Sequence, residues 1–250
     1  MKKKLPLLSL SIFFCSVVQG IGWAQQRPVD LVYPLLDAAN SRWFYFSSAC
    51  HPFGMVNLFP DNDISGEWDS GYLYKEDSIR SFTHIHEWQL AGGAVMPVAF
   101  TTENIKQVLQ NKTSFFSHDT ETVNPGYHAL TLDRYGIGVE LTASNRVGFH
   151  RYEYPATQNA GVIFELGGTL GPSEMIRGGF QKVNANEIRG FTVNGPTIRR
   201  PKETPVYFNA VFNKPIRKIL LYANNELREV NEWNGKDGKI LVVFETEKEK

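Results

Sequence analysis

The chain has 250 residues and no formal net charge, since 26 Lys and Arg residues balance 26 Asp and Glu residues. Its length is ample for a hydrophobic core in one large β domain or two small ones. No basic run or stripe in the sequence argues for nucleic acid as a partner.

The first 24 residues are typical of a secretory signal peptide. Three lysines precede an apolar stretch, which ends at Trp23-Ala24 before Gln25. The stretch is too short and wrongly flanked for a transmembrane anchor, so we expect cleavage after Ala24 and export to the periplasm or the medium. Residues 25–250 then form the mature chain, with Cys50 as its single thiol and no internal disulfide.

Short strand-like runs bounded by turn residues follow through most of residues 25–250. Alternating or continuous apolar runs predict strands at Val56–Phe59, Tyr127–Asp133, Val139–Ala143, Phe149–Tyr154, Gly161–Leu166, Ile188–Val193, Val206–Phe212, Lys218–Ala223 and Ile240–Thr246. One short helix is predicted at Thr102–Gln110, with Thr102 as its cap. Asn234-Gly235 and Asp237-Gly238 are the strongest hairpin signals. This pattern predicts an all-β fold, a two-sheet antiparallel β-sandwich.

Two segments suggest ligands without specifying them. Asp61–Gly66 resembles the start of a calcium loop, but the twelfth position is Tyr72 instead of Glu, which favours a capped turn over a calcium site. His84 and His86 lie two residues apart, so on a strand both rings would face one side and share a metal or a sugar hydroxyl. Hydrogen bonds to the backbone or to a neighbouring ring are the simpler explanation for these histidines.

Trp68 and the carboxylates are the candidates for carbohydrate chemistry. Trp68 lies in a polar loop flanked by glycines, where an indole either stacks on a sugar ring or packs into the core. Glycoside hydrolysis needs two carboxyl groups on opposite sides of the scissile bond. Spacing does not pair the available carboxylates, so we assign no catalytic residue; the candidates are Glu67, Asp69, Glu87, Asp119 and Glu121.

An ordered series of motifs resembles the family 92 glycoside hydrolases, which are exo-acting α-mannosidases. The family motifs are PFGMV-x-L-x-PD, W…SGYxY, I-x-GFSHTH, SH-x-x-E…PGYY, ELT…R-x-G-x-HRY-x-x-P and F-x-x-x-FSKP. They correspond to Pro52–Asp61, Trp68–Tyr74, Ile79–His86, Ser117–Tyr127, Glu140–Pro155 and Phe208–Pro215. No single motif is decisive, but the series covers about two hundred residues in the same order.

The resemblance implies a larger enzyme than this chain. In the family an N-terminal β-sandwich packs on a C-terminal (α/α)6 barrel, which holds most of the acid, base and calcium ligands. The enzymes invert the anomeric centre and use calcium to help distort the bound mannose. By resemblance, this chain is the sandwich alone, without the catalytic barrel, and its own segments hold no metal.

By the same resemblance, four residues would bind substrate. Trp68 matches the tryptophan that reaches the leaving-group sugar, and His84 and His86 match the histidine pair of the same wall. Phe46 is retained where Ser41–Ser48 replaces the glycine-rich segment of the family. We therefore expect part of an exported α-mannosidase that binds α-mannoside glycans. The alternative is a free-standing carbohydrate-binding or interaction module without hydrolase activity.

Overall fold

The structure is a computed structural model, and it describes residues 26–36, 38–39, 48–62, 71–87, 90–156, 159–170 and 173–244. The chain divides into two units, residues 1–31 and residues 32–250. In the first unit the described residues form a short 3-10 helix, η1 (Pro28–Leu31), in which Asp30 accepts hydrogen bonds from the Arg27 side chain. The remaining elements belong to the second unit.

The second unit is built almost wholly from antiparallel strands. Among the described residues the largest sheet has eight strands, in the order β1 (Ala49–Cys50), β2 (Asn57–Asp61), β4 (Ser81–Thr83), β7 (Val95–Ala99), β13 (Ala160–Glu165), β21 (Lys239–Phe244), β18 (Ile216–Ala223) and β19 (Glu226–Glu229). The four-stranded sheet has the order β12 (Gly148–Glu153), β11 (Ile137–Ala143), β10 (Tyr127–Leu132) and β9 (Thr122–Asn124).

A five-stranded sheet and two short strand pairs complete the described β structure. The five-stranded sheet contains β14 (Gly168–Leu170), β15 (Ser173–Asn184), β16 (Glu187–Asn194) and β17 (Thr204–Val211), with β20 (Glu232–Gly235) paired to β15. The short pairs are β3 (Ser78–Ile79) with β8 (Ser114–Phe115) and β5 (Ile85–Glu87) with β6 (Leu90–Gly92).

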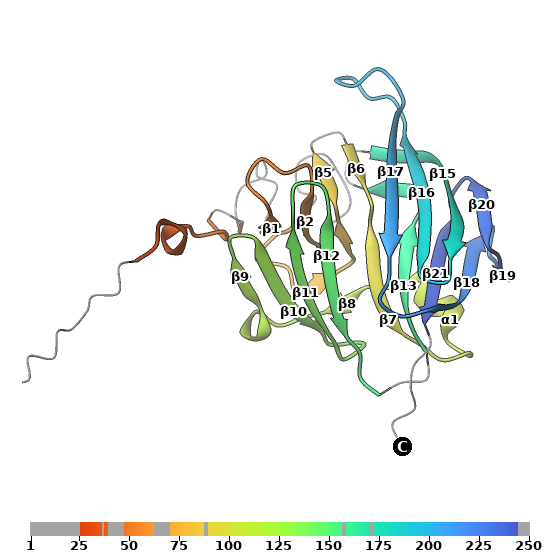
Figure 1. Cartoon of the computed structure of the whole chain (residues 1–250), viewed down its shortest axis with the longest axis horizontal. Coiled ribbons are helices and arrows are strands. Elements are labelled where there is room, and N and C mark those ends of the chain that lie inside the picture. Colours follow the sequence, from red (N-terminus) through yellow and green to blue (C-terminus); the bar gives the residue numbers. More distant parts are fainter. Residues whose placement is uncertain are drawn as a thin grey trace, which may run out of the picture. The chain divides into compact units, whose positions relative to one another are not determined.

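The four- and five-stranded sheets cover the same face of the eight-stranded sheet (Figure 1). Phe164 of β13 stacks on Phe208 of β17, with 5.7 Å between the ring centroids. Leu58 of β2 lies against Gly148 of β12. Because the strand registers place Leu58 and Phe164 on one face, the core forms a continuous layer between the large sheet and the two smaller ones. The predicted antiparallel sandwich is confirmed, with its second layer divided between two sheets.

The opposite face of the large sheet is covered by helix α1 (Ile105–Gln110) and the residues after it. Lys239 of β21 donates to the carbonyl oxygen of Leu109 at 3.2 Å. Glu165 of β13, the register partner of Lys239, forms an ion pair of 2.6 Å with Lys112. Burial alone would raise the pKa of the Glu165 carboxyl, but the charges of Lys112 and Lys239 lower it below its ordinary value. The helix is thus held against the sheet by the ion pair of Lys112 with Glu165 as well as by its buried Val108 and Leu109 side chains.

The predicted helix cap is wrong. The helix begins at Ile105, and its cap residue is Asn104, which makes no side-chain hydrogen bond to the first turn. Asn104 is instead paired with Thr101: its side-chain oxygen accepts from the Thr101 amide at 2.7 Å, and its own amide donates to the Thr101 hydroxyl at 3.3 Å. This pairing closes a turn before the helix starts, so Thr102 is not needed as a cap.

The two predicted hairpin turns are also wrong. Asn234 and Gly235 belong to strand β20, where they pair with Gly179 and Gly178 of β15. Asp237 does turn the chain, with φ of 52°, but the strands on either side of it lie in different sheets. The hairpin between β18 and β19 turns instead at Asn224 and Asn225, both with positive φ.

The strand boundaries otherwise follow the prediction closely. Strand β2 runs on through Pro60 to Asp61, although Pro60 was expected to end it. Strand β1 pairs only with Asn57 and Leu58 of β2, so one edge of β2 is unpaired at Pro60. Proline has no backbone N–H, and none is required at this unpaired edge.

Candidate functional site

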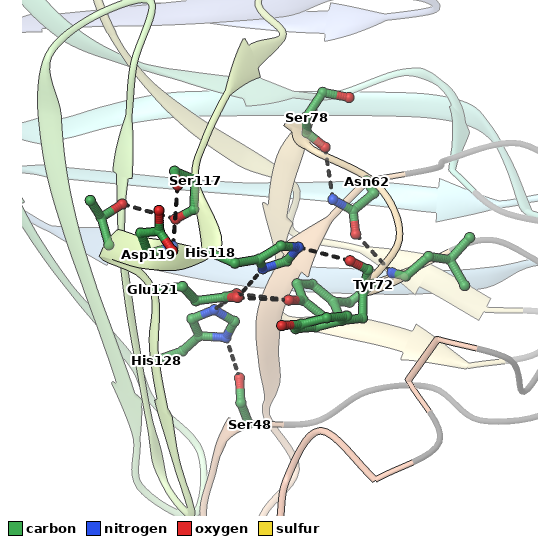
Figure 2. A network of polar contacts seen from close by, with 12 residues as sticks. Ser48, Asn62, Tyr72, Ser78, Ser117, His118, Asp119, Glu121 and His128 are labelled. Atoms are coloured by element: carbon green, nitrogen blue, oxygen red, sulfur yellow. Dashed lines mark hydrogen bonds and ion pairs between the residues drawn. The ribbon is translucent and has the colours of Figure 1, made fainter.

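Glu121 is the centre of a buried polar network near the start of β1 and the end of β2 (Figure 2). Its side chain is 3% exposed. The carboxylate accepts hydrogen bonds from the Tyr72 hydroxyl at 2.8 Å, from His118 Nδ1 at 2.6 Å and from His128 Nε2 at 2.8 Å. A short 3-10 helix, η2 (His118–Thr120), positions His118, and the Ser117 hydroxyl caps it by accepting from the Asp119 amide.

The surroundings of Glu121 favour its ionised form. Burial alone would raise the pKa of this carboxyl, but the hydrogen bonds from His128, His118 and Tyr72 lower it below its ordinary value. Both ring nitrogens of His118 face acceptors, because His118 Nε2 also lies 2.7 Å from the carbonyl oxygen of Tyr74. The His118 ring is therefore held between the Glu121 carboxylate and the Tyr74 carbonyl group. The stacking of Tyr74 on His118, at 4.1 Å between centroids, fixes the ring.

The same network fixes the chain on either side of residues 63–70. Asn62 precedes this segment, and its side chain accepts from the Leu73 amide at 2.7 Å and donates to the carbonyl of Ser78 at 2.8 Å. Tyr72 follows the segment and donates to Glu121. The Asn62 amide also donates to the carbonyl of Gly71 at 2.9 Å, so the two residues that flank this segment are bonded to each other.

The residue after positions 41–47 also belongs to the network. Ser48 follows them directly, and its hydroxyl lies 2.7 Å from His128 Nδ1. The Glu121 network thus holds residues that flank two segments, Ser48 after the one that contains Phe46, and Asn62 and Tyr72 around the one that contains Trp68. Phe46 and Trp68 themselves lie outside the described residues, so their roles stay predictions.

Ser48, His128 and Glu121 stand in the order hydroxyl, imidazole, carboxylate that nucleophilic hydrolases use. Here Ser48 is 1% exposed and His128 is fully buried. A nucleophile needs space beside it for the atom that it attacks, and a buried hydroxyl has none. These three side chains hold the fold, and Glu121 is not available as a glycosidase acid or base.

His84 lies in a second chain of hydrogen bonds, between the sheets. It occupies a bend between β4 and β5, and its Nδ1 is bonded to the carbonyl oxygen of Gly93. Because a carbonyl only accepts, Nδ1 carries the proton and His84 Nε2 accepts from His150 Nε2 at 2.9 Å. His150 Nδ1 in turn accepts from the Tyr152 hydroxyl at 2.7 Å. This arrangement is complete when both rings are neutral.

Acidification below pH 6.5 is expected to destabilise the protein through His84 and His150. Burial lowers the pKa of both rings from the ordinary value of 6.5, and the charge of His84 lowers that of His150 further. As the pH falls, His84 and His150 therefore bind protons in the unfolded chain at a pH at which they stay neutral in the folded chain. The free energy of unfolding should fall by up to about 1.4 kcal/mol per pH unit for each histidine.

Urea unfolding between pH 7.5 and 5 measures this effect. The range lies above the titration of Glu121, whose pKa is lowered and whose contribution is lost only at more acidic pH. The variant His150→Gln should show a shallower fall, while the exposed control His51→Gln should keep the slope of the original chain. An unchanged slope in His150→Gln would contradict the assignment.

Of the four predicted site residues, His84 and His86 lie in the described part of the chain, and Phe46 and Trp68 lie outside it. The backbone of His84 lies beside Asn57 at the start of β2. His84 and His86 do not share one strand, because β4 ends at Thr83 and His86 lies in β5. The hydrogen bonds of His84 match the simpler explanation; a contact of His84 or His86 with sugar stays a prediction.

The part of the chain that the structure describes offers no metal site. It contains no group of three or more His, Cys, Asp or Glu side chains placed to hold an ion. The two described residues of the calcium-like loop have other partners: Asp61 is buried beside the Ser81 hydroxyl, and the Asn62 oxygen accepts from Leu73. Asp63–Gly66 lie outside the described residues. No helix in the described ranges is long and apolar enough to cross a membrane.

The comparisons with known proteins agree with this fold. A model of the glycosyl hydrolase family 92 N-terminal domain matches residues 31–250. No curated protein was found to match.

Several solved structures share the fold. A family 92 α-mannosidase from Bacteroides thetaiotaomicron, in complex with mannoimidazole, is 24% identical with a TM-score of 0.75, over 89% of this chain and 31% of that one. An inverting family 92 mannosidase from the same organism is 18% identical with a TM-score of 0.68, over 89% of this chain and 30% of that one. The chain thus spans about a third of the length of these solved structures.

Proposed function

The chain belongs to the family 92 glycoside hydrolases, whose N-terminal domain it contains over residues 31–250, and on this basis we propose that it is the β-sandwich part of an exported α-mannosidase. The match over nearly the whole chain is the observation that carries the proposal. The similar α-mannosidase structures are about three times as long, so the chemistry is assigned to a further, catalytic domain.

The sandwich contributes sugar-contacting loops to the active site in this proposal. The Glu121 network supports it, because it anchors the segments that carry Phe46 and Trp68 through Ser48, Asn62 and Tyr72. Loops held by a rigid scaffold are the usual place for binding residues. Trp68 would stack on the leaving-group sugar, with Phe46, His84 and His86 as further contacts.

Acid–base chemistry and calcium belong to the catalytic domain in the same proposal. Among the described carboxylates, Glu121 and Glu165 are buried and engaged by cationic or hydrogen-bonding partners, so neither faces a glycosidic bond. The described residues do not fit calcium, since they gather no set of oxygen ligands. We derive no step of hydrolysis from this chain alone. Inversion of the anomeric centre and dependence on calcium would be properties of the intact enzyme.

The purified chain is expected not to hydrolyse an aryl α-mannoside, with or without added calcium. The reason is that the proposal assigns the pair of carboxyl groups on opposite sides of the sugar site to the catalytic domain. Release of the aryl alcohol, followed by absorbance, measures the activity. Turnover that persists in every single-carboxylate variant indicates a contaminating enzyme. Turnover that one substitution, such as Glu121→Gln or Asp119→Asn, abolishes would overturn the proposal.

The companion experiment extends the chain. The coding sequence beyond Lys250 should continue into a helical domain, and the joined product should hydrolyse α-mannosides. Trp68→Ala in that product should lower kcat/KM by about tenfold or more, as expected for an aromatic anchor of a binding site. The exposed Phe149→Ala is the matched control and should have no effect.

A further inference from the structure

A groove of about 950 Å3 crosses the outer face of the five-stranded sheet. This volume lies within the range of small-molecule sites. The groove runs across β17, β16, β15 and β20, which Figure 1 shows lying side by side. Its floor is the backbone of one row of register partners, in which the three side chains other than glycine point to the core: Phe208, Gly190, Phe180 and Trp233.

One side of the groove is an aromatic row. Tyr207 of β17 is 75% exposed, and its ring lies 6.1 Å from that of its register partner Phe191, at an angle of 44°. The Phe191 ring lies over Gly179 of β15, where a Cβ atom would come within 2.8 Å of it. Glycine at this position therefore lets the ring lie flat on the sheet. Asn234 of β20 ends the row.

The other side of the groove is a polar row. Its register partners are Asn209, Arg189, Gln181 and Glu232. Arg189 donates two hydrogen bonds to the Gln181 side-chain oxygen, at 3.2 and 2.7 Å, and this pairing orients both planar groups. Within the described part of the chain, the side chains of Asn209, Glu232 and Asn234 make no hydrogen bond. The charges of Arg189 and Glu232 cancel, so the row favours a neutral ligand.

A sugar ring has two chemically different surfaces that fit these two rows. Its C–H groups form an apolar face that stacks on an aromatic ring, and its hydroxyl groups form a rim that hydrogen-bonds to amides, carboxylates and guanidinium groups. A covering protein domain would instead leave much of the polar row without water or partners, at a cost in free energy. We propose that this groove binds a segment of a neutral oligosaccharide chain, as a second sugar site separate from the loops of residues 41–47 and 63–70.

Native gel electrophoresis of the purified chain through α-mannan tests the groove. We expect the polysaccharide to retard the original chain, and Tyr207→Ala and Asn209→Ala to weaken the apparent affinity by about tenfold or more. Both side chains are exposed on one face of β17, so these substitutions leave the core unchanged. Phe149→Ala removes an exposed aromatic ring from another sheet and should keep the affinity of the original chain.

The variant Trp68→Ala separates this inference from the proposed function. Retardation that Trp68→Ala abolishes and Tyr207→Ala leaves intact would overturn the groove as a sugar site while supporting the proposed function. Retardation that only the groove variants abolish supports the groove, whatever the outcome of the hydrolysis experiments. Absence of retardation in the original chain would overturn the groove as a sugar site. A change in the self-association of Tyr207→Ala without any change in retardation would also overturn it, because that result would indicate a protein-binding face.

Discussion

Replacing Glu121 by alanine is expected to destabilise the folded chain by about 3–5 kcal/mol, the cost of removing one partner from a buried charged network. The substitution leaves three donors without an acceptor: the Tyr72 hydroxyl, His118 Nδ1 and His128 Nε2. His128 is fully buried, so water cannot replace the carboxylate there. The free energy of unfolding, measured in urea, is the readout.

Glu140 supplies a matched control for this substitution. It also accepts from a tyrosine and a cation, Tyr127 at 3.0 Å and Arg151 at 3.0 Å, but on the outer face of the four-stranded sheet. The side chains of Glu140 and Arg151 are 40% and 75% exposed. Glu140→Ala should therefore cost only about 0–1 kcal/mol. Equal effects of Glu121→Ala and Glu140→Ala would show that the Glu121 network does not hold the fold.

Gly178→Ala is expected to destabilise the chain by at least the about 1–3 kcal/mol typical of overpacking, because the new methyl group meets main chain. A Cβ atom at this position would lie 2.0 Å from the carbonyl oxygen of Leu166, between β13 and β14. A side chain can rotate away from such a contact, but this backbone is fixed by the bond from the Leu166 amide to the carbonyl of Gly238. Thermal and urea unfolding both measure the loss.

The corresponding control is Gly138→Ala in β11. A Cβ atom there meets only the Cβ of Glu153, at 3.6 Å, which is an ordinary contact. Alanine also reduces the freedom of the unfolded chain, so this variant should be neutral or more stable by up to about 1 kcal/mol. If Gly178→Ala were as stable as Gly138→Ala, the two layers would not approach each other as closely as described.

Alternation in the sequence predicts strands well wherever one face is buried. In β10 the even-numbered side chains, His128, Leu130 and Leu132, are buried and the odd-numbered ones are not, as the sequence indicates. In β17 the exposed and half-buried residues alternate in the predicted register from Thr204 to Val211. The period of two follows directly from the geometry of a strand with one face on a core.

The longest strand, β15, does not follow from such a pattern. It contains Gly178 and Gly179 in its middle, a pair that reads as a loop when sequence is considered alone. The structure explains the glycines by contacts from distant residues: Gly178 faces the Leu166 backbone, and Gly179 lies under the Phe191 ring. Such reasons depend on tertiary packing and are not visible in the residues around them.

The candidate site is predictable only in part for the same reason. The motif series marks Ser117, His118 and Glu121, and these residues do lie together. Their partners come from other parts of the chain: Tyr72 is 49 residues before Glu121, and Ser48 is 80 residues before His128. Local spacing does not reveal such pairs. The sequence alone therefore leaves Glu121 among the possible catalytic carboxylates, although its partners in the folded chain leave it no such role.

The place of β21 in the eight-stranded sheet limits when the sheet can be completed during folding. This strand is the last one described along the chain, yet it lies inside the sheet, paired with β13 on one side and β18 on the other. Until residues 239–244 have joined the sheet, β13 and β18 each present an edge of unpaired backbone N–H and C=O groups, and such edges pair with other chains. Folding of the sheet can therefore finish only after β21 has paired, and its long-range pairing makes that step slow. A newly made chain would depend on chaperones during this interval.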